Sequence, residues 1–173
     1  MVGPRDVKTP GYRTRSVGET LGANILSANN SGFISSVGNW VADPDNTAEW
    51  TGSEYQDLIC TQADETEATR EMIARISCAA ANVAQNKTYQ MTFTVEHNGT
   101  FDGTAVGVSL LNVATGSVDN ITTVDPTTDP QTVTARITFL NDITGGIEIK
   151  TTGTAPTQND ICYIDDVFIQ EVL

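Results

Sequence analysis

The chain has 173 residues, of which 39% are hydrophobic and 18% are charged, with a formal net charge of −13 and a pI near 4.1. This length suits one domain with a substantial core, and the negative charge argues against a nucleic-acid partner, because like charges repel. No segment approaches the run of about eighteen apolar residues that a membrane helix needs, so the sequence predicts no membrane partner.

The first 22 residues form a segment of their own. Two prolines and four glycines interrupt any regular pattern, so we predict an extended N-terminal arm (1–22) on a body of residues 23–173. Residues 1–20 hold four basic and two acidic side chains, whereas the rest holds five basic and twenty acidic ones. A weakly basic arm on an acidic body predicts an attachment segment, and a chance distribution of charge is the alternative. The side chains assigned to attachment are Arg5, Lys8, Tyr12, Arg13 and Arg15.

The body consists of short β-rich runs separated by turn residues. In chain order these runs cover residues 24–28, 32–42, 47–52, 55–62, 70–83, 88–98, 104–116, 117–124, 131–141, 145–153 and 160–172. Two runs alternate between apolar and polar residues, as strands with one buried face do. Their expected inward side chains are Tyr89, Met91, Phe93 and Val95, and then Val133, Ala135, Ile137 and Phe139. Such strands, with no β-helix-β rhythm, predict an all-β, antiparallel sandwich or barrel.

The segment from residue 65 to residue 83 allows two interpretations. Its apolar residues fit a helical stripe, and its alanines favour a helix. Ile76, Cys78 and Ala80 fit one face of a strand instead. We prefer the strand because both neighbouring segments are strands, with a short helix over residues 64–72 before it as an open alternative.

The three cysteines, Cys60, Cys78 and Cys162, each lie in an apolar stretch. Their number is odd, and their spacing suits no metal site. We therefore predict buried free thiols that pack as small apolar side chains. A bridge between Cys60 and Cys78 is the alternative.

The final twelve residues, CYIDDVFIQEVL, pose a problem of parity. Cys162 and Ile164 have even numbers, whereas Val167 and Ile169 have odd ones, so a regular strand cannot bury all four. A β-bulge at Asp165–Asp166 would absorb the slip, leaving one carboxylate at the bulge and one in solvent. In the alternative the odd-numbered residues face inward, and Asp165 is forced toward the core, where it needs donors or a cation.

Four segments, in this order, resemble the jelly roll of carbohydrate-binding modules, a group related to galactose-binding-like domains. They are NILSANNSGF with Trp40 behind it, NVAQNKTYQMTFTVE, TVTARITF and YIDDVFIQEV, and they span about residues 23–173. The resemblance implies a jelly-roll β-sandwich that binds sugars through aromatic rings on a concave sheet or at loop tips. Trp50 and Tyr55 flank a turn and are the preferred pair, with Trp40 and Phe101 as further candidates. Packing in a core or interface is the alternative for all four.

Members of this group often hold a structural calcium between their first and last strands. The resemblance implies that Asp165 or Asp166 supplies one ligand and that a Glu after the opening Gly-Phe supplies another. This chain has Ile34 at the second position, which removes one oxygen from a site that takes about six to eight. We therefore predict no cofactor, with calcium at Asp165 or Asp166 as the alternative.

No catalytic motif stands out, and His97 is the only histidine, so we predict that the chain is not an enzyme. Jelly rolls of this kind also serve bacteriophages as decoration, fibre or tail-surface modules. The basic arm, the initial Met1 and the lack of an apolar signal-peptide run favour that role.

The sequence thus predicts a virion structural protein with an outward acidic body. Its partners would be other virion proteins, such as a major capsid protein, and host-surface glycans; a homo-oligomer is compatible with this. The alternative is a secreted or cell-surface carbohydrate-binding module of a larger glycan-active protein.

Overall fold

The computed structural model describes residues 19–33, 38–41, 49–54, 57–61, 72–97, 99, 101, 105–151 and 161–173, with the backbone alone at 49–54, 57–61, 72, 73, 120 and 122. Within these residues ten strands and one short helix follow each other. They are β1 (Leu21–Asn24), α1 (Ala28–Ser31), β2 (Glu49–Glu54), β3 (Asp57–Thr61), β4 (Met72–Ser77), β5 (Lys87–His97), β6 (Val106–Leu111), β7 (Gly116–Thr122), β8 (Gln131–Phe139), β9 (Gly146–Thr151) and β10 (Ile161–Val172).

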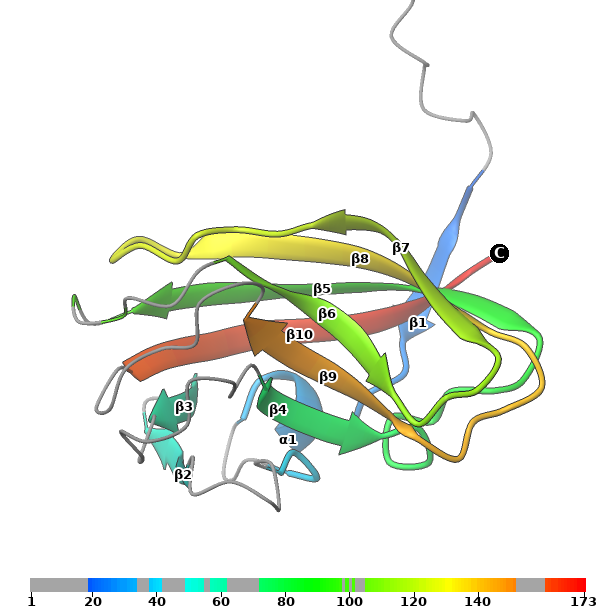
Figure 1. Ribbon diagram of the computed structural model, residues 1–173, viewed down its shortest axis with the longest axis horizontal. Coiled ribbons are helices and arrows are strands. Elements are labelled where there is room, and N and C mark those ends of the chain that lie inside the picture. The colour runs from blue at the N-terminus through cyan, green and yellow to red at the C-terminus, as the bar shows by residue number, and fades with distance from the viewer. Residues whose placement is uncertain are drawn as a thin grey trace, which may run out of the picture.

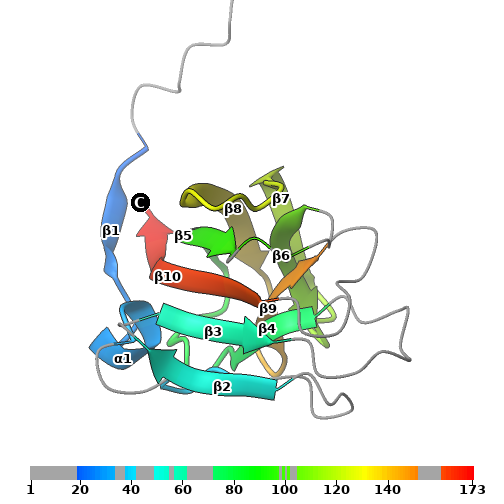
Figure 2. The ribbon, with the colours of Figure 1, turned by 90° about the vertical axis from the view of Figure 1, so that its left-hand side faces the viewer.

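The strands form two antiparallel sheets that face each other. The large sheet has the order β2-β3-β10-β5-β8-β7, and β1 pairs with the far end of β10. The small sheet has the order β4-β9-β6 and lies in front of β10 and β5 in Figure 1. Figure 2 shows the two layers from the side. The predicted all-β sandwich is confirmed, and in the described part of the chain no helix is long and apolar enough to cross a membrane.

The core lies between the two sheets and follows the alternation of the sequence. In β5 and β8 the buried residues are the eight predicted ones, each at most 3% exposed, because alternate side chains of a strand point to opposite faces. The two strands pair in register over nine residues, from Lys87 opposite Phe139 to Val95 opposite Gln131. The small sheet closes the core with Ala74, Ile76, Val108, Ile147 and Ile149.

The closing strand β10 contains the predicted bulge. Cys162, Ile164, Val167 and Ile169 are all buried, and the pairing with β5 shifts between Asp165 and Phe168. Asp166 is the extra residue of the bulge. Its φ is 50°, in the left-handed region, and its side chain is exposed. The bulge therefore lets one strand bury apolar residues of both parities.

The opening segment differs from its expected form. Residues 24–28 were expected to be a strand, but only Asn24 belongs to β1, which begins at Leu21 within the predicted arm. Ser27 caps the short helix α1 instead, because its hydroxyl accepts a hydrogen bond from the Asn30 N–H (3.4 Å). Residues 32–42 also form no continuous strand, since residues 38 and 39 form a turn and Val41 makes an isolated bridge with Arg75.

The structure also tests the expected strand within residues 65–83 and the expected state of the cysteines. The preferred strand within residues 65–83 is confirmed as β4, although it ends at Ser77 and residues 78–82 form turns. Cys78 and Cys162 are buried free thiols, as predicted, which excludes the Cys60–Cys78 bridge. Burial raises the pKa of the Cys78 thiol to about 11.

Asp166 gives a test of the bulge. A β-branched residue is disfavoured at a positive φ, so we expect Asp166→Val to lower the free energy of unfolding by about 1–3 kcal/mol. Asp166→Asn should change it by less than about 0.5 kcal/mol, because Asn tolerates this conformation and the side chain is exposed. Urea denaturation measures both values, and equal stabilities would contradict the bulge.

Candidate functional site

The outer face of the small sheet carries a row of hydrogen-bonding side chains. Arg75 on β4 and Ser109 on β6 are both register partners of Glu148 on β9, so the three lie side by side across the sheet. The Ser109 hydroxyl donates to Glu148 Oε2 over 2.9 Å. Lys150 follows Glu148 on the same face, opposite Gly107. All four side chains are half-buried, so the row reaches solvent.

A pocket of about 270 Å³ adjoins this row at the end of the small sheet. Its lining combines a guanidinium, two hydroxyls and an amide with the backbone of two glycines. A Cβ on Gly145 would lie 1.9 Å from the Leu111 carbonyl oxygen, so a side chain would not fit there. The lining residues are Arg75, Ser77, Leu111, Asn112, Thr144, Gly145 and Gly146.

Asp142 fixes the loop that forms the rim of this pocket. Its Oδ1 accepts from both the N–H (2.8 Å) and the hydroxyl (2.7 Å) of Thr144, and its Oδ2 accepts from the Ala114 N–H (3.0 Å). These hydrogen bonds lower the pKa of the Asp142 carboxyl, and the two from Thr144 have the largest effect. The carboxylate thus ties the loop before β9 to the turn after β6 and positions Thr144.

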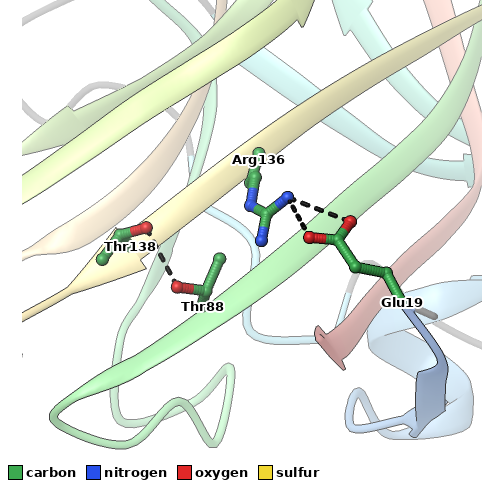
Figure 3. A network of polar contacts seen from close by, with 4 residues as sticks. All are labelled: Glu19, Thr88, Arg136 and Thr138. Carbon is green, nitrogen blue, oxygen red and sulfur yellow. Dashed lines mark hydrogen bonds and ion pairs between the residues drawn. The ribbon is translucent and has the colours of Figure 1, made fainter. Parts of the chain in front are cut away.

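The outer face of the large sheet is a second polar surface, rich in threonine. Thr94 lies opposite Thr132 and Thr92 opposite Thr134, while Phe168 on β10 lies beside Thr92 and is 38% exposed. Farther along β5 and β8, Arg136 donates to both carboxylate oxygens of Glu19 (2.9 and 3.1 Å), and Thr88 bonds Thr138 (Figure 3).

At the other end of this face, next to the bulge, lies a pocket of about 290 Å³. It is lined by Thr94, Glu96, Pro130, Tyr163, Asp165 and Asp166. Asp165 Oδ1 is buried there without a hydrogen-bond partner. Burial, together with the neighbouring charge of Asp166, raises the pKa of Asp165. This oxygen is an acceptor for which the described residues supply no donor.

The aromatic residues predicted to stack on sugars differ in burial and contacts. Trp40 is only 3% exposed, and its indole N–H donates to the Asn30 carbonyl (2.9 Å). Its assignment to sugar binding is therefore wrong, because a core ring cannot stack on a sugar. Phe101 is half-buried and stacks on the His97 ring, with 6.3 Å between centroids. The side chains of Trp50 and Tyr55 lie outside the described residues.

The predicted attachment residues Arg5, Lys8, Tyr12, Arg13 and Arg15 also lie outside the described residues, and their role stays a prediction. For calcium, no three His, Cys, Asp or Glu side chains in the described ranges are grouped so as to hold a metal ion. Ser31, near the bulge, donates its hydroxyl to the Val167 carbonyl (2.6 Å). Asp165 and Asp166 as calcium ligands stay a prediction.

No protein-family model matches the sequence, and no curated protein matches it. Among solved structures, the chain is similar to a carbohydrate-binding module of family 4, with 21% identity over 84% of this chain and 99% of that one (TM-score 0.56). It has the carbohydrate-binding-module jelly-roll fold.

Two family 22 modules support the same fold. One is the CBM22-1 xylan-binding domain of Paenibacillus barcinonensis Xyn10C, with 13% identity over 78% of this chain and 86% of that one (TM-score 0.56). The other belongs to the CBM22-1–GH10 modules of Clostridium thermocellum xylanase 10B in complex with xylohexaose, with 17% identity over 87% of this chain and 28% of that one (TM-score 0.57). The resemblance inferred from the sequence is thus confirmed at the level of fold.

The row on the small sheet was not among the sites predicted from the sequence. Arg75, Glu148 and Lys150 occupy outward positions of alternating strands, which the pattern alone could have shown. Their proximity could not be seen, because β4, β9 and β6 are far apart in sequence and their pairing is a property of the fold.

The raised pKa of Asp165 predicts a pH-dependent difference in stability. A carboxyl whose folded pKa lies above its unfolded value stabilises the fold when protonated and loses that contribution as pH rises through the folded pKa. Asp165→Asn should therefore be more stable than wild type at pH 7, and the gap should shrink as pH falls toward 3.8 and below. Urea denaturation over this range measures it, and a gap independent of pH would refute the assignment.

Asp142→Asn serves as the control of opposite sign. Because the folded pKa of Asp142 is lowered, its charge stabilises the fold above the unfolded pKa and the benefit is lost as pH falls through the folded pKa. The variant should be less stable than wild type at pH 7, with the penalty fading in acid. The same sign for both variants would contradict the two environments described above.

Proposed function

We propose that the chain is a non-catalytic carbohydrate-binding module that binds neutral glycans on the outer face of its small sheet. The observation that carries the proposal is the row Arg75–Glu148–Ser109, which ends at a solvent-accessible pocket lined by further hydrogen-bonding groups. The fold supports it, since the similar family 22 structures are a xylan-binding domain and a two-module CBM22-1–GH10 protein complexed with xylohexaose. A shared fold by itself does not determine a ligand, so the row supplies the chemical argument.

A neutral sugar suits this face because each sugar hydroxyl both donates and accepts hydrogen bonds. Arg75 supplies donors only, Glu148 supplies acceptors only, and the Asn112 amide and Ser77 hydroxyl supply both. The pocket volume of about 270 Å³ lies near the lower limit of ligand sites and suits a sugar unit rather than a large molecule. No aromatic ring lines the described part of the pocket, so hydrogen bonds would carry the affinity.

In this proposal the partner is a glycan and the site of action is extracellular, as part of a larger glycan-active protein or alone. The virion role stays a prediction. It depends on the basic residues of the arm, which lie outside the described residues, and none of the similar structures reported above is a virion protein.

Substitution of Glu148 tests the proposal. We expect Glu148→Gln to weaken the binding of xylohexaose or cellohexaose by about tenfold or more, because a hydrogen bond to a charged group contributes roughly 1.5–3 kcal/mol. Isothermal titration calorimetry on the full chain, with a panel of neutral oligosaccharides, gives the dissociation constants. Ser109 can still donate to the Gln oxygen, so the variant should remain folded.

The matched control is Asp119→Asn, which removes one carboxylate from the outer face of the large sheet. Asp119 lies on β7 opposite Arg136 and is exposed. Its loss should leave neutral oligosaccharide binding unchanged. Equal effects of both substitutions, or no binding of any neutral oligosaccharide by the wild type, would contradict the proposed site.

A further inference from the structure

We infer that the outer face of the large sheet holds a second saccharide site, which takes a sugar bearing a protonated amine. It lies at the bulge, on the opposite side of the sandwich from the small-sheet row, and does not depend on that row. The pocket there has a volume of about 290 Å³. Its walls come from β5 and β10, which pair on both sides of the bulge, so the rigid centre of the sheet holds it in place.

One carboxylate oxygen beside the pocket lacks a hydrogen-bond partner. Asp165 lines the pocket, and its Oδ1 is buried and receives no hydrogen bond from the described residues, although the Asp166 backbone N–H bonds the same carboxyl group. A buried acceptor without a donor costs free energy, and the cost is larger for a charged group. The backbone of Asp165 stays paired with Thr94, so the carboxyl cannot leave the face by a simple shift of register. A ligand that donates a hydrogen bond to this oxygen would supply the missing partner.

The lining of the pocket is acidic. Three of its six lining residues are carboxylic acids, namely Glu96, Asp165 and Asp166, and none is Lys, Arg or His. The body of the chain is itself strongly acidic. Such a pocket repels a uronic acid and attracts a cation, and charge-assisted hydrogen bonds to carboxylates are about twice as strong as neutral ones.

The pocket suits an organic ammonium better than a metal ion. A calcium ion requires several oxygen ligands that converge on one point, and the described carboxylates form no such group. Acceptors spread around a pocket suit an ammonium on a larger molecule instead, and Tyr163, which lines the pocket, is an aromatic residue of the kind that attracts cations.

A surface suited to further sugar units continues from the pocket. The threonine pairs Thr94–Thr132 and Thr92–Thr134 follow it along β5 and β8, with the exposed ring of Phe168 beside Thr92. Hydroxyls and a solvent-facing ring suit further sugar units. The ion pair between Glu19 and Arg136 limits this surface at its far end (Figure 3).

The test compares two sugars that differ only at the nitrogen, methyl glucosaminide with its free amine and methyl N-acetylglucosaminide. The full chain is titrated with each at about pH 7, which favours the ionised form of a carboxyl with a raised pKa such as Asp165, and the backbone amides are followed by NMR. We expect the amine to shift the signals of Thr94, Glu96 and Tyr163 and to bind about tenfold or more tightly than the acetylated sugar. Equal affinities, or no shifts at these residues, would overturn the inference.

Four variants test the site and supply its controls. Asp165→Asn and Glu96→Gln should each weaken amine binding by about tenfold, whereas Asp119→Asn should leave it unchanged. If Asp119→Asn weakens it equally, the amine is attracted by the surface charge as a whole and the site is disproved. Glu148→Gln distinguishes the two proposals, because it should reduce neutral oligosaccharide binding and spare the amine.

Discussion

The register slip in β10 is the constraint on which the other features depend. This strand pairs with β1, β3 and β5, so its side chains set which faces of three neighbours point inward. Its first half buries even-numbered residues and its second half odd-numbered ones, and a single extra residue at Asp166 connects the two. Without that residue, half of the strand would turn its apolar side chains to solvent.

The bulge also explains how the opening of the chain is held to its end. Beyond the slip, Asn24 Oδ1 accepts from the Ile169 N–H (3.0 Å), and the Ile25 N–H donates to the Ile169 carbonyl (2.9 Å). Ser31 donates to the Val167 carbonyl and in turn accepts from the Asn24 amide (2.9 Å). These neutral hydrogen bonds connect the first and last segments of the sandwich, where the resemblance implied a calcium ion.

Much of this architecture could be predicted from sequence, since alternation is a local property. The inward residues of β5 and β8 followed from period two, and the parity conflict in the last twelve residues predicted the bulge. Residues 24–31 could not be predicted in this way, because a Ser cap and a few hydrogen bonds determine the backbone there and the sequence shows no clear alternation. Trp40 could have served a core or a surface, and only the packing around Asn30 decides between them.

The candidate site was less predictable because it is assembled from distant strands. Arg75, Ser109 and Glu148 are unremarkable one at a time, and only the order β4-β9-β6 makes them a row. The pocket at the bulge differs in this respect, since the Asp165–Asp166 pair was conspicuous in the sequence. The pairing of β10 with β5 could not be seen in the sequence. This pairing places Thr94 and Glu96 opposite Asp165 and Tyr163.

The two outer faces therefore offer a ligand different chemistry on one scaffold. The small-sheet face mixes donors and acceptors and has Arg75 and Lys150 near Glu148, so it is close to neutral locally in a strongly acidic chain. The pocket at the bulge offers carboxylates with no basic side chain among its lining residues. Because charge acts over about 10 Å at moderate salt, each face responds mainly to its own side chains. Selection between neutral and cationic sugars then follows from outward positions of β4, β9 and β6 on one face and of β5 and β10 on the other, with the apolar core between them unchanged.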